Sequence, residues 1–129
     1  MAWLFLDTHA MGQVRVAWLD GARVEEERVE ARSQAALPLV ERLVAGRREA
    51  LEGICVVQGP GSFSAVRTGV LDANLLARLW KVPLVALVGE EATDLAALAN
   101  RLKEGAFKPT RYVAPTYDAE PNITLPKSS

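Results

Sequence analysis

The chain has 129 residues, of which half are hydrophobic and 24% are charged, a composition that suits one globular domain. Fifteen basic residues oppose sixteen acidic ones, and a formal net charge of -1 does not indicate a strongly basic nucleic-acid-binding protein. No apolar run reaches the roughly 18 residues that a membrane span needs, and the single cysteine cannot form an internal disulfide. We therefore expect a cytoplasmic protein without a membrane partner.

The first thirty residues predict three strands. Residues 2–7 (AWLFLD) are typical of a short buried strand, and residues 12–20 alternate between apolar and polar positions. The dipeptide Asp20-Gly21 is a strong hairpin-turn signal. Residues 22–31 carry many charges, which suits an exposed edge strand, although a short helix is the rival interpretation.

Helices alternate with wholly apolar strands in the middle of the chain. The predicted helices cover residues 34–46, 64–81 and 90–102, and the predicted strands cover residues 53–58 and 82–89. Ser33 is a candidate cap for the first helix. Strands that are apolar at every position are typical of a sheet buried on both faces. Beyond Lys103 the periodicity ends, with one short strand expected at "RYVA".

This order of elements predicts a three-layer α/β fold with a mixed five-stranded sheet. Hairpin pairing and right-handed crossovers favour the strand order 3-2-1-4-5. This is the ribonuclease-H-like arrangement, also found in each lobe of the actin-like ATPases. We expect a single lobe over residues 1–104 and an extended C-terminal tail over residues 105–129.

The glycine-rich stretch "GPGSFSAVR" between a strand and a helix has two interpretations. Backbone N–H groups at a helix N-terminus bind anions, so Gly59, Gly61, Ser62 and Arg67 are candidate anion or nucleotide ligands. The stretch lacks the spacing G-x-x-x-x-G-K-[ST], and Ser64 breaks the pattern G-x-G-x-x-G. We therefore favour a tight turn with Ser62 or Ser64 as helix cap, and keep the anion site as the alternative.

Asp7 and Thr8 follow the first predicted strand and are further candidates for such a site. In nucleotide-binding proteins of this architecture an acidic residue here holds a metal or a water near phosphates, whereas the simpler interpretation is that Asp7 caps the next turn. His9 is the only histidine, so neither a multi-histidine metal site nor a Ser-His-Asp triad is indicated. We expect no catalytic residue and no metal ligand set.

Small residues recur at every fourth position of the second predicted helix. This ridge consists of Ala65, Gly69, Ala73 and Ala77. A glycine inside a helix costs about 0.8–1 kcal/mol relative to alanine, so Gly69 indicates that another backbone comes close. The neighbour is either the first helix, through Leu39 and Leu43, or another subunit. We predict that the ridge and these two leucines bind a partner.

The stretch "GPGSFSAVRTGVLDANLLA" closely resembles the signature G-P-G-S-F-T-G-x-R-x-G-x-x-x-A-x-x-L-A of the TsaB (YeaZ) family, a partner subunit in bacterial tRNA threonylcarbamoyladenosine synthesis. The opening "LFLDTHAMGQVRVAWLDG" and the tail "APTYDAEPNIT" resemble other segments of that family. Three departures stand out: His9 replaces a serine, Ser64-Ala65 replace Thr-Gly, and the family's second lobe has no counterpart of comparable size.

The resemblance implies a shortened, non-catalytic subunit that binds a TsaD-like protein, with a TsaE-like ATPase as a further partner. It implies a homodimer in isolation and only indirect contact with tRNA. No cofactor is expected on this chain, while ATP and a metal are expected on the partner or at the interface with it. Two alternatives stay open: a small ATPase-like enzyme using Asp7 and the loop 59–62, and a self-associating homodimer without a TsaD partner.

Overall fold

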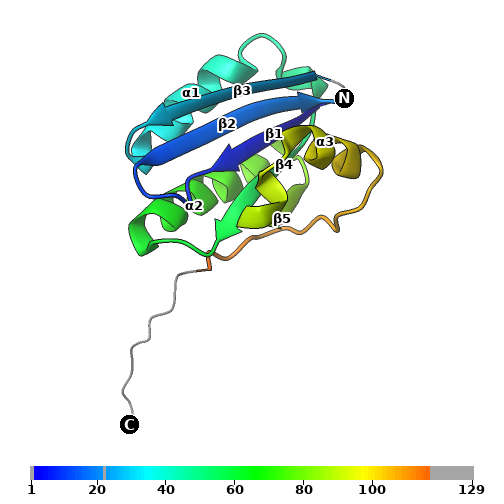
Figure 1. Cartoon of the computed structure of the whole chain (residues 1–129). Coiled ribbons are helices and arrows are strands. Elements are labelled where there is room, and N and C mark those ends of the chain that lie inside the picture. Colours follow the sequence, from blue (N-terminus) through cyan, green and yellow to red (C-terminus); the bar gives the residue numbers. More distant parts are fainter. Residues whose placement is uncertain (1, 22, 117–129) are drawn as a thin grey trace.

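Five strands form one mixed sheet in the order β3-β2-β1-β4-β5 (Figure 1). The computed structural model describes residues 2–21 and 23–116. The strands are β1 (Ala2–Asp7), β2 (Gln13–Asp20), β3 (Arg23–Glu30), β4 (Leu51–Gly59) and β5 (Leu84–Val88). The first three strands pair antiparallel, whereas β1, β4 and β5 run parallel. The predicted strand order and the ribonuclease-H-like arrangement are confirmed.

Helices cover both faces of this sheet and make the three predicted layers (Figure 1). The helices are α1 (Ala36–Val44), α2 (Phe63–Trp80) and α3 (Leu95–Lys103), with short 3-10 turns η1 (Ser33–Ala35), η2 (Arg48–Ala50) and η3 (Gly89–Ala92). Helices α1 and α2 pack on one face, and α3 packs on the other. The crossover helix α2 on one face and α3, which follows the last strand, on the other explain why the apolar strands β4 and β5 are shielded from water on both sides.

Alternate residues of each strand enter two separate cores because side chains point to opposite faces of a sheet. In β1, Leu4 and Leu6 belong to the core under α1 and α2, whereas Phe5 faces α3. The same alternation reaches the edge strand β3, where Val29 packs into the first core and Val24 into the second. The prediction of an edge strand is confirmed, and the rival helix is wrong.

Three local predictions are corrected. Ser33 does not cap a helix, because it begins the 3-10 turn η1 and no side chain caps α1. The third helix begins later than expected, because Asp94 caps it by accepting a hydrogen bond from the Ala97 backbone N–H at 3.1 Å. The stretch "RYVA" forms no strand; only Thr110 makes an isolated bridge, with Leu84.

The segment after α3 returns along β5 and α2 rather than leaving the domain (Figure 1). The Thr110 N–H donates to the Leu84 carbonyl at 2.7 Å, and Val113 is buried in the core. Asn74 of α2 binds the Val113 backbone twice, donating to its carbonyl at 2.8 Å and accepting from its N–H at 2.9 Å. The division at residue 104 stays a prediction, and residues 117–129 of the predicted tail lie outside the described residues.

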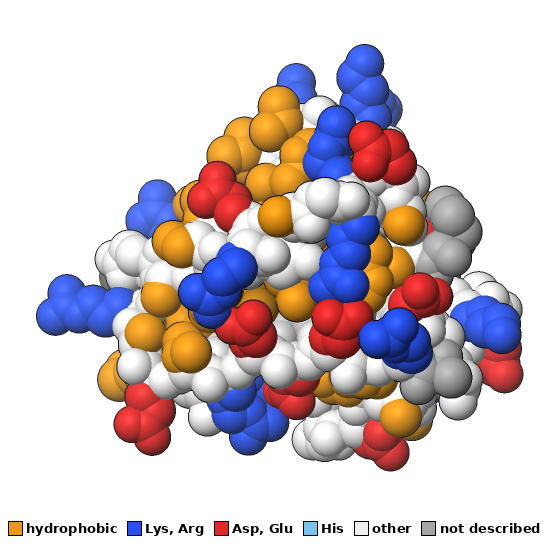
Figure 2. All heavy atoms as spheres, turned by 90° about the horizontal axis from the view of Figure 1, so that it is seen from above, with side chains coloured by type: hydrophobic (Ala, Val, Ile, Leu, Met, Phe, Trp, Pro, Cys, Tyr) orange, Lys and Arg blue, Asp and Glu red, His pale blue; other side chains and the backbone are white. Residues whose placement is uncertain are grey.

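Charges of both signs alternate over the face that Figure 2 shows, with apolar side chains between them. On the β3 edge, Arg42 pairs with Glu27, and both nitrogens of the Arg47 guanidinium fork donate to Glu25 at 2.9 and 3.0 Å. This pairing lowers the pKa of Glu25 below its usual range. Within the described part of the chain, no helix is both long and apolar enough to cross a bilayer.

Candidate functional site

Asp7 lies at the carboxyl end of β1, where it is only 2% exposed, and both of its carboxylate oxygens are occupied by this chain. Oδ1 accepts from the His9 backbone N–H at 2.9 Å and lies 2.6 Å from His9 Nδ1. Oδ2 accepts from Arg15 at 3.2 Å. The buried carboxylate is therefore paired with a guanidinium and an imidazole from its own chain.

Arg15 connects this carboxylate to the rest of the sheet. It lies opposite Asp7 in the β1–β2 register, donates to Glu26 at 2.8 Å and to the Ala92 carbonyl at 3.0 Å, and stacks over the Phe5 ring. Burial opposes the charged form of Glu26, but the hydrogen bonds from Arg15 and Arg28 outweigh it and lower the pKa of Glu26. Four groups surround this one guanidinium, namely two carboxylates, a backbone carbonyl and an aromatic ring, and they make it the centre of a structural network.

This network does not fit a metal or nucleotide-phosphate role for Asp7. A cation would have to displace Arg15 from the carboxylate, which would deprive the buried guanidinium of one of its two carboxylate partners. Among the described residues, no group of three or more His, Cys, Asp or Glu side chains is placed to hold a metal ion. Asp7 is therefore used in a structural ion pair of this chain, and whether a nucleotide binds near the end of β1 stays a prediction.

Thr8 explains the glycine inside α2. Its hydroxyl donates to the Ala65 carbonyl at 2.6 Å, and a Cβ built on Gly69 would lie 2.2 Å from the same hydroxyl oxygen. Gly69 has an ordinary helical backbone, so glycine is needed here for space and not for its φ angle. The predicted close approach is present, but the neighbour is the end of β1 and not another helix.

The glycine loop is also filled by this chain's own backbone. Gly59 has φ +122°, which favours glycine, precedes a cis peptide bond to Pro60, and sits where a Cβ would lie 2.0 Å from the Thr116 carbonyl oxygen. A Cβ on Gly61 would lie 2.6 Å from the His9 carbonyl oxygen. These contacts support the tight-turn interpretation, while anion binding by the loop stays a prediction.

The other two loop candidates, Ser62 and Arg67, differ in their exposure to solvent. Ser62 occupies the N-cap position of α2, but its side chain makes no cap bond, and its hydroxyl is buried without a hydrogen-bond partner in the described structure. Arg67 is exposed and its guanidinium lies 5.4 Å over the Phe63 ring. The structure therefore brings Asp7, Thr8 and the loop together but leaves Arg67 outside them.

The ridge of small residues faces inward. All four of its members are buried, and they pack against the sheet of this chain: Ala65, Gly69, Ala73 and Ala77. Leu39 and Leu43 of α1 are likewise buried in the same core, at 6% and 7% exposure. In the isolated chain the space over the small side chains is taken by β1 and the core, and partner binding by these six residues stays a prediction.

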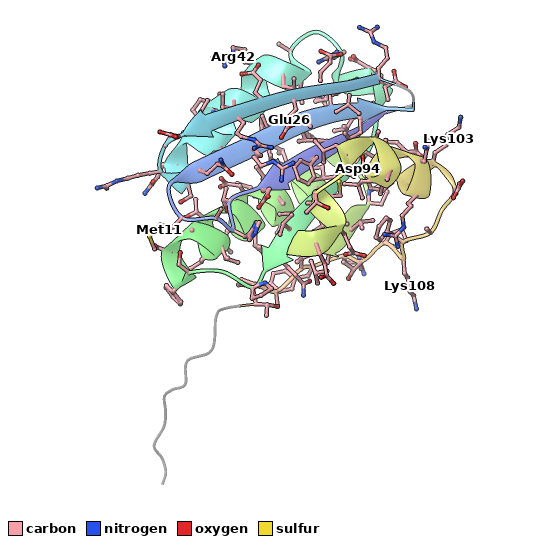
Figure 3. All side chains as sticks on the ribbon, in the orientation of Figure 1. Met11, Glu26, Arg42, Asp94, Lys103 and Lys108 are labelled. Atoms are coloured by element: carbon pink, nitrogen blue, oxygen red, sulfur yellow. The ribbon has the colours of Figure 1, made fainter. Side chains whose placement is uncertain are left out.

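The outward face of α2 carries large apolar side chains instead. Leu71, Leu75 and Leu79 follow one another at four-residue spacing and are 45%, 59% and 66% exposed. Phe63, at the start of the helix, is 56% exposed. Met11, in the turn between β1 and β2, is another exposed apolar residue (Figure 3). We call Phe63, Leu71, Leu75 and Leu79 the outer row. An exposed apolar row of this kind is a candidate interaction surface.

Two structural residues were missed from the sequence. Arg15 interrupts the apolar positions of β2 with a charge, and that interruption signals a buried ionic partner in the neighbouring strand. Asn74 binds a backbone far along the chain, and a single asparagine in a helix gives no signal for that contact.

The sequence of this chain is similar to that of proteins that modify tRNA. The family model described as "TsaD: tRNA N6-adenosine threonylcarbamoyltransferase" matches residues 26–121. A protein from Burkholderia multivorans described as tRNA N6-adenosine threonylcarbamoyltransferase is 42% identical over 55 residues, which are 40% of this chain and 16% of that protein.

Solved structures of YeaZ proteins are similar to this chain in fold and in sequence. YeaZ from Pseudomonas aeruginosa superposes with a TM-score of 0.62 at 29% identity, over 68% of this chain and 45% of that chain. A second Pseudomonas aeruginosa protein, described as similar to peptidase YeaZ, gives 0.61 at 30% identity, over 80% and 48%. T. thermophilus RuvC, at 13% identity and a TM-score of 0.53, shares the fold alone, over 85% and 99%. This chain thus spans about half the length of the YeaZ structures.

Proposed function

This chain belongs to the TsaD family, and from that premise we propose that it is a non-catalytic subunit that binds a TsaD-like protein and supports threonylcarbamoyladenosine modification of tRNA. The observation that carries the proposal is the outer row of α2, which leaves Leu71, Leu75 and Leu79 about half exposed in the isolated chain. The likeness to YeaZ agrees with a role in the same modification.

The outer row has the form of a helix-packing surface. Residues four apart form a ridge that fits the groove of a second helix, and each square ångström of apolar surface removed from water contributes about 25 cal/mol. The guanidinium of Arg67 over Phe63 adds a cationic edge to the row. A partner helix with an apolar stripe and an acidic flank would complement both features.

The end of β1 supports the non-catalytic part of the proposal. In this chain Asp7 is committed to Arg15 and His9, so the acidic position where a metal or water would be held is used for folding. ATP and any metal are therefore placed, in our proposal, on the TsaD-like partner. We further propose that the complex works in the cytoplasm and accepts a TsaE-like ATPase as a third component.

Co-purification with the TsaD-like protein of the same genome tests the proposal. The variant Leu71→Glu/Leu75→Glu should lose the partner, because two carboxylates would be buried in an apolar contact. The control Ala96→Glu/Asn100→Glu adds the same charges at the same spacing on exposed positions of α3 and should keep it. Retention of the partner by the first variant, with an unchanged melting temperature, would place the contact elsewhere.

Self-association through the outer row is the second candidate, since an apolar row on one helix is also available to a second copy. Native mass with and without the TsaD-like protein separates the two. A homodimer that gives way to a heterodimer supports the partner role, whereas a homodimer unchanged by added partner supports self-association.

Calorimetry with ATP, ADP and Mg²⁺ tests the ATPase-like alternative, in which Asp7→Ala should abolish any heat of binding.

A further inference from the structure

A groove of about 820 Å³ runs between the C-terminal half of α2 and the segment that returns past β5. Its charged lining residues are Arg78, Lys81 and Arg111, and no carboxylate lines it. All three cations are exposed, and none of them has an ion-pair partner among the described residues. In a chain with a formal net charge of -1, these residues form a local concentration of positive charge without an ion-pair partner in the described part of the chain.

A structural role accounts for only part of this cluster. The helix dipole favours cations near the C-terminus of a helix. This effect explains why Arg78 lies in the last turn of α2 and Lys81 at its C-cap. Arg111 comes from a different segment and has no such reason to be there. Its position brings a third cation to a groove that already holds two.

The walls of the groove are held in place before any ligand arrives. Lys81 has the left-handed backbone of a helix C-cap, with φ 58°, and its N–H donates to the Ala77 carbonyl. The opposite wall is tied to β5 by Thr110 and to α2 by the two hydrogen bonds of Asn74. Fixed walls lower the entropy cost of binding.

The groove also offers an aromatic surface and neutral hydrogen-bonding groups. Tyr112 lines it with 60% of its side chain exposed, and Asn74 and Thr110 line it as well. Bases of RNA that are not paired stack on exposed aromatic rings, while Arg and Lys contact the phosphates. An acidic peptide would use the cations but would leave the ring without a planar partner.

We infer that this groove binds the phosphate backbone of the tRNA substrate, with Tyr112 stacking on an unpaired base. The choice of tRNA rests on the proposed function. The groove shares Leu75 with the outer row of α2, but its three cations are not members of that row. The chain would then contact tRNA directly, contrary to the indirect contact expected from the sequence. It would contribute a small number of phosphate contacts to the complex.

Fluorescence anisotropy with an unmodified transcript of a threonylcarbamoyl-acceptor tRNA tests the inference on the isolated full chain. Binding should be in the micromolar range, with log affinity falling linearly with log salt. The variant Lys81→Asn/Arg111→Gln should weaken binding about tenfold and reduce the salt slope by about 1.5. Asparagine is chosen at position 81 because it tolerates the left-handed backbone.

A matched control removes two charges from the other edge of the sheet. Arg23→Gln/Arg32→Gln changes exposed arginines at β3 and just after it, and should leave affinity and slope within twofold of the parent chain. Tyr112→Leu should weaken binding about fivefold with an unchanged slope, because it removes stacking and no charge. Unchanged melting temperatures exclude unfolding as the cause in each case.

Four outcomes would overturn the inference: no binding of the transcript by the parent chain, equal binding by Lys81→Asn/Arg111→Gln, an equal loss in the control, or tighter binding of poly-glutamate than of the transcript. Co-purification with the TsaD-like protein is measured on the same variants and should be unchanged. If the parent chain does not bind tRNA but still binds the TsaD-like protein, the inference about the groove is wrong and the proposed function is unaffected. If the chain does not bind the TsaD-like protein, the proposed function is wrong, and the anisotropy measurement still tests the groove because it uses the isolated chain.

Discussion

The two faces of α2 share a four-residue spacing but differ in the size and the burial of their side chains. The inner face carries Ala65, Gly69, Ala73 and Ala77, which let the helix approach β1 so closely that a hydroxyl on Thr8 reaches a helix carbonyl. The outer face carries large apolar side chains that this chain leaves uncovered. Small residues on a helix can thus mark a close contact inside a domain, while the bulky residues beside them stay at the surface, where we propose that a partner binds.

The largest effect on this comparison is expected from Gly69→Ala. The new methyl group would lie 2.2 Å from the Thr8 hydroxyl oxygen, so strand or helix must shift, and this outweighs the roughly 1 kcal/mol that alanine gains in helix propensity. We expect a net loss of about 2–3 kcal/mol in the free energy of unfolding, measured by urea denaturation.

The variant Thr8→Ala separates crowding from other causes. It removes both side-chain atoms nearest to the new methyl group, so the double variant Thr8→Ala/Gly69→Ala should lose less stability than the sum of the two single variants. Additive losses would show that Gly69 is needed for some reason other than the contact with Thr8.

A smaller effect, confined to binding, is expected from Leu75→Ala on the outer face. The side chain is 59% exposed, so unfolding free energy should change by no more than about 0.5 kcal/mol. Affinity for the TsaD-like protein should fall about thirtyfold, measured by surface plasmon resonance, because a central apolar side chain of an interface is lost. A large loss of stability with unchanged affinity would reverse the roles of the two faces.

The smallest effect is expected from Asp72→Asn, at the boundary between the two faces. Burial raises the pKa of Asp72 to about 6, and no cation pairs with it among the described residues. The folded chain therefore binds a proton that the unfolded chain releases between about pH 4 and pH 6, so this carboxylate lowers stability as pH rises through that range.

Removing the charge should stabilise the chain by about 1 kcal/mol at pH 7.5, a value kept small because solvent still reaches the carboxylate. The melting temperature should rise by about 4 °C at pH 7.5, and the difference from the parent chain should shrink below pH 4. Circular dichroism melts at both pH values measure this. An equal difference at both pH values would mean that the charge of Asp72 is not responsible.

The sequence by itself determined the order of elements, the strand order of the sheet and the likeness to YeaZ, because these follow from local patterns. Alternation in β2, the hairpin at Asp20-Gly21 and continuous apolar runs in β4 and β5 each reflect the environment of one segment. The glycine inside α2 likewise predicts a close contact, although the sequence does not identify the residue that makes it.

Only the tertiary structure decided which atoms meet. Thr8 fills the space over Gly69, Arg15 occupies the carboxylate of Asp7, and Asn74 holds Val113, all through contacts between segments distant in the chain. Spacing along a helix shows that two faces differ, but the face that is buried depends on how the helix is rotated against the sheet. That rotation results from packing of the whole core, which no short stretch of sequence encodes.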